Sequence, residues 1–200
     1  MLRPTGFTSA RLVYRAVRFP ADEATFERAF ADPTVRLGCL PGVCAPMGKA
    51  DMDGWRNFNE GIAPGFAMIV SLPAATPDAA DEPVGWVCLA RVGGDGGIHR
   101  KGEFGCFITA AHCGKGYATE AVEWVLEMAF VTYGLHRLEG GVFSWNKAAL
   151  RVYEKAGFVI EGRRRDAFWM EGSFHDDIQI AILDHEYRAR HPDKFKRLAT

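Results

Sequence analysis

The sequence predicts a single mixed α/β domain, of the α+β kind, in which a mostly antiparallel sheet of about six to seven strands is flanked by helices. Apolar segments of strand length mostly follow one another as hairpins, and two amphipathic helices come late in the chain. This order argues against a doubly wound parallel sheet. The 200 residues suit one domain over 1–200, with a core at about 10–184 and a polar, peripheral tail at 185–200.

The first half of the chain supplies four of the expected strands and one short helix. Its segments are, in order, a strand at Leu12–Val17, a helix at Ala21–Phe30, an irregular loop at Gly38–Gly54, a strand at Phe66–Leu72, a surface loop at Pro73–Pro83, a strand at Val84–Val92, a hairpin turn at Gly93–Gly97 and a strand at Arg100–Thr109.

The second half contains the two longer helices. The first helix carries one apolar stripe, formed by Ala118, Ala121, Val122, Val125, Leu126, Ala129 and Phe130, and ends before Gly134. A strand at Arg137–Trp145 follows, and Asn146 then caps a helix that ends at Gly157. The last two strands, Phe158–Gly162 and Asp177–Leu183, are joined by a long arm.

Composition narrows the functional classes. With 24 basic and 25 acidic residues the net charge is −1, so nothing attracts the chain to nucleic acid or to a membrane surface. The sequence has no apolar run of membrane-spanning length and no secretory signal pattern. Five cysteines, without a Cys-x-x-Cys pair, indicate a reduced and cytoplasmic protein.

The most informative segment is the turn Cys113–Gly116, which leads directly into a helix. Such a turn leaves several backbone N–H groups unpaired, and the helix dipole adds partial positive charge at the same place. This combination is typical of phosphate binding. A P-loop would need a hydroxyl residue after Lys115, and a Rossmann fingerprint would need glycine at Thr119, so both matches are weak.

Several short motifs in one order resemble the GCN5-related N-acetyltransferase superfamily, in particular the branch of ribosomal-protein N-terminal acetyltransferases and their small-amine relatives. The matching segments are Glu103-Phe104-Gly105, Cys113-Gly114-Lys115-Gly116-Tyr117-Ala118, Tyr117–Ala121, Asn146, Tyr153–Phe158 and Gly172–Asp176. They fall in family order across about 10–184, and the ordered set is specific although each motif alone is weak. One position departs from the pattern, because Cys113 replaces the usual Arg or Gln, and this implies weaker cofactor binding.

The resemblance implies transfer of an acetyl group from acetyl-CoA to a primary amine, by direct attack in a ternary complex. The amine would belong either to a protein N-terminus or to a small molecule. The implied cofactor contacts are Phe107, Ile108, Thr109, Cys113, Gly114, Lys115, Gly116, Tyr117, Ala118, Thr119 and Asn146. Glu103 would serve as the base, through water, and Tyr153 as the acid that protonates the leaving thiolate.

The resemblance also implies that aromatic residues flank the acceptor amine. Trp55 and Phe58 would form one wall of this slot, and Trp169 and Phe174 the other. Acidic residues of the same arm, Glu171, Asp176 and Asp177, would suit a cationic amine. The exposed arm also offers a contact for a homodimer.

Simpler interpretations stay open at several positions. Glu103 can be a solvated strand residue, Tyr153 a core residue, and Asn146 only a helix cap. The spacing of His99, Cys106, His112 and Cys113 matches no common zinc site, so no metal is expected. The basic run Arg163–Arg165 reads as a solvated strand face. The rival function is a regulatory module that binds acyl-CoA without catalysis.

Overall fold

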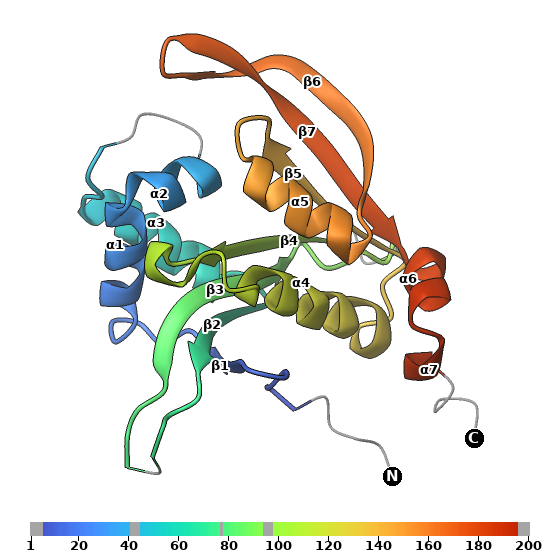
Figure 1. Ribbon diagram of the computed structural model, residues 1–200, viewed down its shortest axis with the longest axis horizontal. Helices are drawn as coiled ribbons and strands as arrows, with labels where there is room; N and C mark the ends of the chain where they lie inside the picture. The colour runs from blue at the N-terminus through green and yellow to red at the C-terminus, as the bar shows by residue number, and fades with distance from the viewer. Residues whose placement is uncertain (1–5, 41–44, 77, 94–97, 196–200) are drawn as a thin grey trace.

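The computed structural model describes residues 6–40, 45–76, 78–93 and 98–195 (Figure 1). Over these residues the chain forms one seven-stranded sheet, in the order β1-β2-β3-β4-β5-β7-β6. The strands are β1 Val13–Ala16, β2 Phe66–Leu72, β3 Glu82–Ala90, β4 Lys101–Ile108, β5 Arg137–Phe143, β6 Val159–Met170 and β7 Ser173–Leu183. Every neighbouring pair is antiparallel except β4 and β5, which run parallel. The predicted fold class is therefore confirmed.

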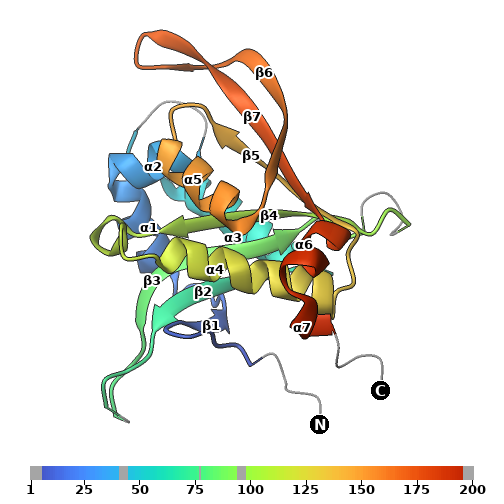
Figure 2. The same ribbon diagram turned by 45° about the vertical axis from the view of Figure 1, so that its right-hand side comes forward.

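Helices cover both faces of the sheet (Figures 1 and 2). They are α1 Glu23–Ala31, α2 Pro33–Cys39, α3 Lys49–Glu60, α4 Tyr117–Glu127, α5 Lys147–Ala156, α6 Asp184–Arg190 and α7 Pro192–Phe195. Helix α4 continues as a π-helical turn over Met128–Thr132. Strand β3 shows how the faces divide, because its side chains alternate between two cores. Val87 and Leu89 pack with α4, whereas Trp86 and Cys88 pack with α1 and α3.

The parallel pair is the feature that shapes the site. Only Lys101–Glu103 of β4 is in register with Arg137–Glu139 of β5. Beyond Glu103 the two strands diverge, while β4 stays paired with β3 as far as Ile108. The divergence leaves the second half of β4 without a strand on that side.

The predicted loop at Gly38–Gly54 is too long and is wrong at both ends, although residues 45–48 are irregular as predicted. Helix α2 extends to Cys39 and α3 begins at Lys49, while residues 41–44 lie outside the described residues. Asp51 accepts a hydrogen bond from the amide of Gly48 at 2.8 Å and so closes the first turn of α3. This helix is mostly polar, which hid its periodicity in a segment rich in Gly and Pro.

The predicted arm between the last two strands is also corrected. Strand β6 continues as far as Met170, and β7 already begins at Ser173. The arm is therefore a long β-hairpin that projects from the body (Figure 1). Gly172 makes the turn, with a φ of +87°. Cross-strand ion pairs, such as Arg163 with Asp176 at 2.9 Å, let a polar sequence remain a strand.

The segment predicted as a peripheral tail is helical over its described part. Tyr187 of α6 is fully buried in the core beside α4, where its ring lies 5.1 Å from that of Phe130. The predicted loop at Pro73–Pro83 ends two residues early, since β3 begins at Glu82. Most of the Gly93–Gly97 turn lies outside the described residues.

No helix within the described ranges is both long enough and apolar enough to cross a membrane. In the same part of the chain, no group of three or more His, Cys, Asp or Glu side chains is placed to hold a metal ion. Cys39, Cys88, Cys106 and Cys113 carry free thiols, and Cys44 lies outside the described residues.

Candidate active site

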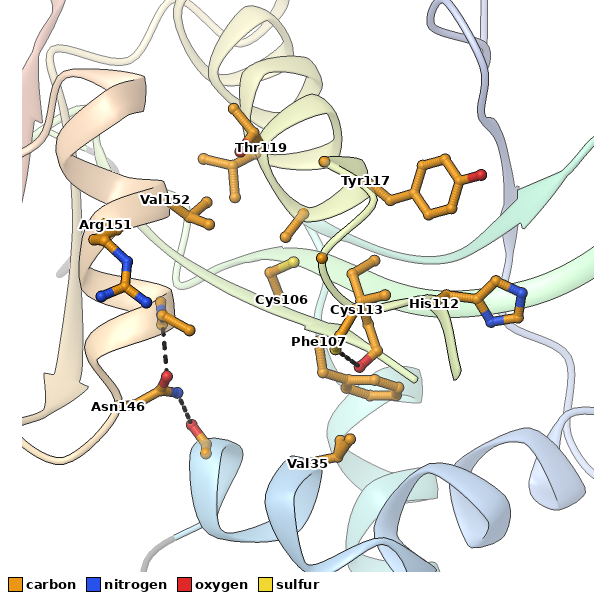
Figure 3. Close-up of a pocket in the computed structure, with 18 of the residues that line it drawn as sticks. Val35, Cys106, Phe107, His112, Cys113, Tyr117, Thr119, Asn146, Arg151 and Val152 are labelled. Atoms are coloured by element: carbon orange, nitrogen blue, oxygen red, sulfur yellow. Dashed lines mark hydrogen bonds between the residues drawn. The ribbon is translucent and has the colours of Figure 1, made fainter. Parts of the chain in front are cut away.

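The glycine-rich turn before α4 presents a set of free backbone amides. Gly114 and Gly116 have φ values of +76° and +83°, which favour glycine because a β-carbon would crowd the backbone there. Among the described residues, the N–H groups from Gly114 to Thr119 donate no hydrogen bond. The positive end of the α4 dipole lies at the same point. The predicted free amides at the start of α4 are thus present, and the turn borders the pocket shown in Figure 3.

These amides border a cavity of about 560 Å³. Its walls are α2, the end of β4, the turn, the start of α4 and one face of α5. The lining residues are Thr34, Val35, Gly38, Cys39, Cys106, Phe107, Ile108, Ala110, His112, Cys113, Gly114, Gly116, Tyr117, Ala118, Thr119, Val122, Asn146, Ala148, Ala149, Arg151, Val152, Tyr153 and Lys155. The cavity lies where β5 has diverged from β4, so it occupies the opening in the sheet.

Tyr153 reaches this cavity from α5. Its ring packs edge-on against Phe104 of β4, with 5.1 Å between the ring centroids. Burial is the main cause that raises the pKa of the Tyr153 phenol, and the nearby thiols of Cys106 and Cys39 raise it further. The hydroxyl therefore stays protonated at neutral pH, and within the described residues it makes no hydrogen bond. A protonated, unpaired hydroxyl is available to a ligand in the cavity.

Asn146 joins two walls of the cavity (Figure 3). Its side-chain oxygen accepts a hydrogen bond from the amide of Ala149 at 3.0 Å, which caps α5. Its side-chain nitrogen donates to the carbonyl of Gly38 at 3.1 Å, at the end of α2. The predicted helix cap is confirmed, and Asn146 also lines the cavity.

Three predicted cofactor residues contribute in different ways. Cys113 lines the cavity, and its thiol lies 3.6 Å from the carbonyl oxygen of Ile108. Thr109 does not line it, because its hydroxyl donates to the carbonyl of Val84 at 3.2 Å and contacts His112 at 2.9 Å. Lys115 does not line the cavity either. These contacts fix the shape of the turn between β4 and α4.

Glu103 lies outside the cavity lining. Its carboxylate pairs with Arg91 at 2.9 Å, near the point where β4 and β5 begin to diverge. On β4 the alternate residue Phe104 contacts Tyr153, whereas Gly105 faces Trp86 on the opposite side. Glu103 therefore lies on the face of β4 opposite to Tyr153.

The structure does not bring the two predicted aromatic walls together. Trp55 of α3 packs in the core against α1, with its ring 5.1 Å from that of Phe30. Its neighbour Phe58 is half-exposed. Trp169 and Phe174 are each 60% exposed and pack against one another at the tip of the β6–β7 hairpin. None of the four predicted residues lines the cavity.

Sequence reasoning missed two parts of the site. The wall formed by α2 was invisible because that helix was not predicted. The cations Arg151 and Lys155 of α5 also line the cavity. The signal for these was available, since Ala148, Arg151 and Lys155 recur on one face of a helix that starts beside Asn146.

Comparisons with known proteins agree with this geometry. The Acetyltransferase (GNAT) domain family matches residues 11–159. The spermidine N(1)-acetyltransferase of Escherichia coli (strain K12) is 33% identical over 94 residues, which cover 47% of this chain and 50% of that protein. The putative ribosomal N-acetyltransferase YdaF of Bacillus subtilis (strain 168) is 31% identical over 90 residues, covering 45% and 49%. The chain thus spans about half the length of these curated relatives.

A solved structure shows the same fold. The spermidine N-acetyltransferase of Vibrio cholerae, in complex with CoA and spermine, superposes with a TM-score of 0.72 at 23% identity. The match covers 90% of this chain and 99% of that chain.

Proposed function

The chain belongs to the acetyltransferase (GNAT) family, and on that premise we propose that it is an acetyl-CoA-dependent N-acetyltransferase whose acceptor is a primary amine. One observation carries the proposal: the free amides of 114–119 border a cavity that also contains the protonated hydroxyl of Tyr153. A phosphate site and a proton donor in one cavity match the needs of transfer from a CoA thioester.

The residues fit the donor in three places. The amides of 114–119 and the α4 dipole bind the pyrophosphate, and Arg151 and Lys155 add positive charge on the opposite wall. The edge of β4 at Phe107 and Ile108, where β5 has diverged, accommodates the extended pantetheine arm. When bound, acetyl-CoA supplies the thioester carbonyl that the amine attacks. Tyr153 then holds the proton that the departing thiolate needs.

We propose Glu103 as the base that deprotonates the acceptor amine. Glu103 acts on the amine through water, from the face of β4 opposite to Tyr153. Glu103 is the last residue of β4 in register with β5, so it lies at the start of the divergence that holds the cavity. Arg91 pairs with Glu103 at 2.9 Å and restrains the orientation of its carboxylate.

We propose a small cationic amine of the polyamine class as the first acceptor to test, and a protein N-terminus as the second. The names of the relatives support this order, because spermidine acetyltransferases of E. coli and V. cholerae are among them. The ribosomal N-acetyltransferase YdaF supports the second class.

The test is release of CoA thiol from acetyl-CoA against a panel of polyamines, monoamines and N-terminal peptides. Wild-type protein should release thiol with one amine class. The Tyr153→Phe variant, which loses only the hydroxyl, should lower kcat by about 10²-fold with little change in the Kd for CoA. Tight CoA binding without release from any amine would instead favour the regulatory module.

A homodimer, or a larger assembly, is proposed on the exposed hairpin tip, where Trp169 and Phe174 form an apolar patch. Sedimentation velocity of the wild type and of Trp169→Ser tests it. A monomeric wild type, or an assembly unchanged by the substitution, would reject this contact.

A further inference from the structure

The outer side of the phosphate-binding turn is held by a single arginine that precedes β1. The backbone amide of Arg11 donates to Oε1 of Glu120 at 2.6 Å, and the side-chain Nε of Arg11 donates to Oε2 of the same carboxylate at 2.8 Å. Ser9 donates its hydroxyl to the same carboxylate at 2.6 Å. Glu120 lies in the first turn of α4, so these contacts tie the N-terminal segment to the helix that begins the site.

The same guanidinium touches three successive residues of the turn. Its Nη1 donates to the carbonyl oxygen of Lys115 at 2.9 Å. Its Nη2 lies 3.3 Å from the position that a β-carbon on Gly116 would take. Its Cζ lies 4.8 Å from the centre of the Tyr117 ring, at cation–π distance. Arg11 itself does not line the cavity, whereas Gly116 and Tyr117 do.

The hydrogen bond from Arg11 to the Lys115 carbonyl also fixes the direction of the next amide, that of Gly116. In a trans peptide the C=O and the following N–H point in opposite directions. Because the Lys115 carbonyl is bonded to Arg11, the Gly116 amide of the same peptide points away from Arg11. Gly114 and Gly116 flank this peptide, and their conformational freedom would otherwise let it rotate.

We propose that Arg11, held by Glu120 and Ser9, is a positioning residue that fixes the Lys115–Gly116 peptide so that its amide is presented to the donor's pyrophosphate. The inference rests on the proposed use of acetyl-CoA. It assigns a role at the cofactor site to a segment about a hundred positions earlier in the chain, outside every motif found in the sequence.

The charge state of the contact agrees with this role. Burial acts to raise the pKa of Glu120, but the hydrogen bonds from Ser9 and Arg11 outweigh it and hold the pKa below its usual range. The carboxylate is therefore ionised at neutral pH, and Arg11 stays in place through the working range. With its side chain 49% exposed, Arg11 keeps part of its hydration, so its effect is expected to be moderate.

The experiment compares CoA binding and turnover in the wild type, Arg11→Ala and Arg11→Lys. Calorimetry should give a Kd for CoA that is about 10-fold higher in Arg11→Ala, the effect of losing one charge-assisted contact. Arg11→Lys keeps the charge but cannot hold both Glu120 and Lys115. Its Kd for CoA should therefore lie between those of the wild type and Arg11→Ala.

A second acyl donor that lacks the pyrophosphate distinguishes a positioning role of Arg11 from a general structural effect. S-acetylpantetheine has the thioester but no pyrophosphate, so its kcat/KM should change less than about 2-fold in Arg11→Ala, while that for acetyl-CoA falls about 10-fold through KM. Arg188→Ala is a matched control, because that arginine is 48% exposed, pairs with Asp184 and stacks on Phe195 away from the turn. It should leave both donors unchanged.

An unchanged Kd for CoA in Arg11→Ala would overturn the inference, and so would an equal loss with both donors. A wild type that does not bind CoA would instead refute the proposed function. The two failures are therefore distinguishable.

Discussion

Replacing Asn146 tests whether its cap and its bridge between α5 and α2 both stabilise the protein. Asn146→Ala removes the cap on the Ala149 amide, which costs about 1 kcal/mol. It also removes the bond to the Gly38 carbonyl, which contributes about 1 kcal/mol more. For a protein of this size about 1 kcal/mol corresponds to roughly 2–4 °C in Tm. The expected loss is therefore about 4–8 °C.

Asn146→Ser separates the two contributions. Serine is as good a cap as asparagine, but its side chain is too short to reach Gly38 as well. Thermal unfolding followed by circular dichroism should place Asn146→Ser about midway between the wild type and Asn146→Ala. Both variants should raise the Kd for CoA, since the bridge holds α2 against α5 across the cavity. This measurement is made by calorimetry on the same samples.

Three results would refute parts of the reasoning. If Asn146→Ala melts within about 1 °C of the wild type, neither hydrogen bond stabilises the fold. If Asn146→Ser is as unstable as Asn146→Ala, the cap contributes nothing and the bridge carries the whole effect. An unchanged Kd for CoA in both variants would leave Asn146 with a purely structural role.

Three further predictions concern other parts of the molecule. Gly157→Ala should lower stability by about 1–2 kcal/mol in urea unfolding, because Gly157 has a φ of +99° and its β-carbon would collide with Arg190; wild-type stability would contradict this. Burial acts to raise the pKa of Asp22, but hydrogen bonds led by Arg15 outweigh it and lower the pKa. The stability from this pair is present above about pH 4 and lost as the pH falls further, so Asp22→Asn should weaken that acid dependence. Glu103→Gln should reduce kcat without changing the Kd for CoA, and a larger effect on binding than on kcat would exclude Glu103 as the base.

The parts of the fold that the sequence predicted are those with one strong signal. Strand β2 has the predicted bounds, Phe66–Leu72, because a run of apolar residues is buried on both faces. The stripe of α4 is likewise buried, and the turn before it has the predicted free amides. In each case local residues determine the structure.

The parts that could not be predicted depend on partners far along the chain. Trp55 looked like one wall of an exposed slot, but it packs against α1 and against Trp86 of β3. The arginines of β6 are exposed, as predicted, but the ion pair of Arg164 with the buried Asp177 on β7 could not be predicted. Tyr187 lies in a polar segment and is nevertheless fully buried. Such contacts are decided by topology, which one sequence does not reveal.

The divergence of β4 from β5 has a consequence for the synthesis of the chain. Strands β1–β4 are complete before α4 is made, and β5 follows only after α4. During that interval the backbone edge of β4 from Phe104 to Ile108 has no strand beside it. A bare edge invites pairing with another nascent chain. This edge is therefore accessible to other chains on the ribosome until α4 and α5 enclose it in the cavity wall.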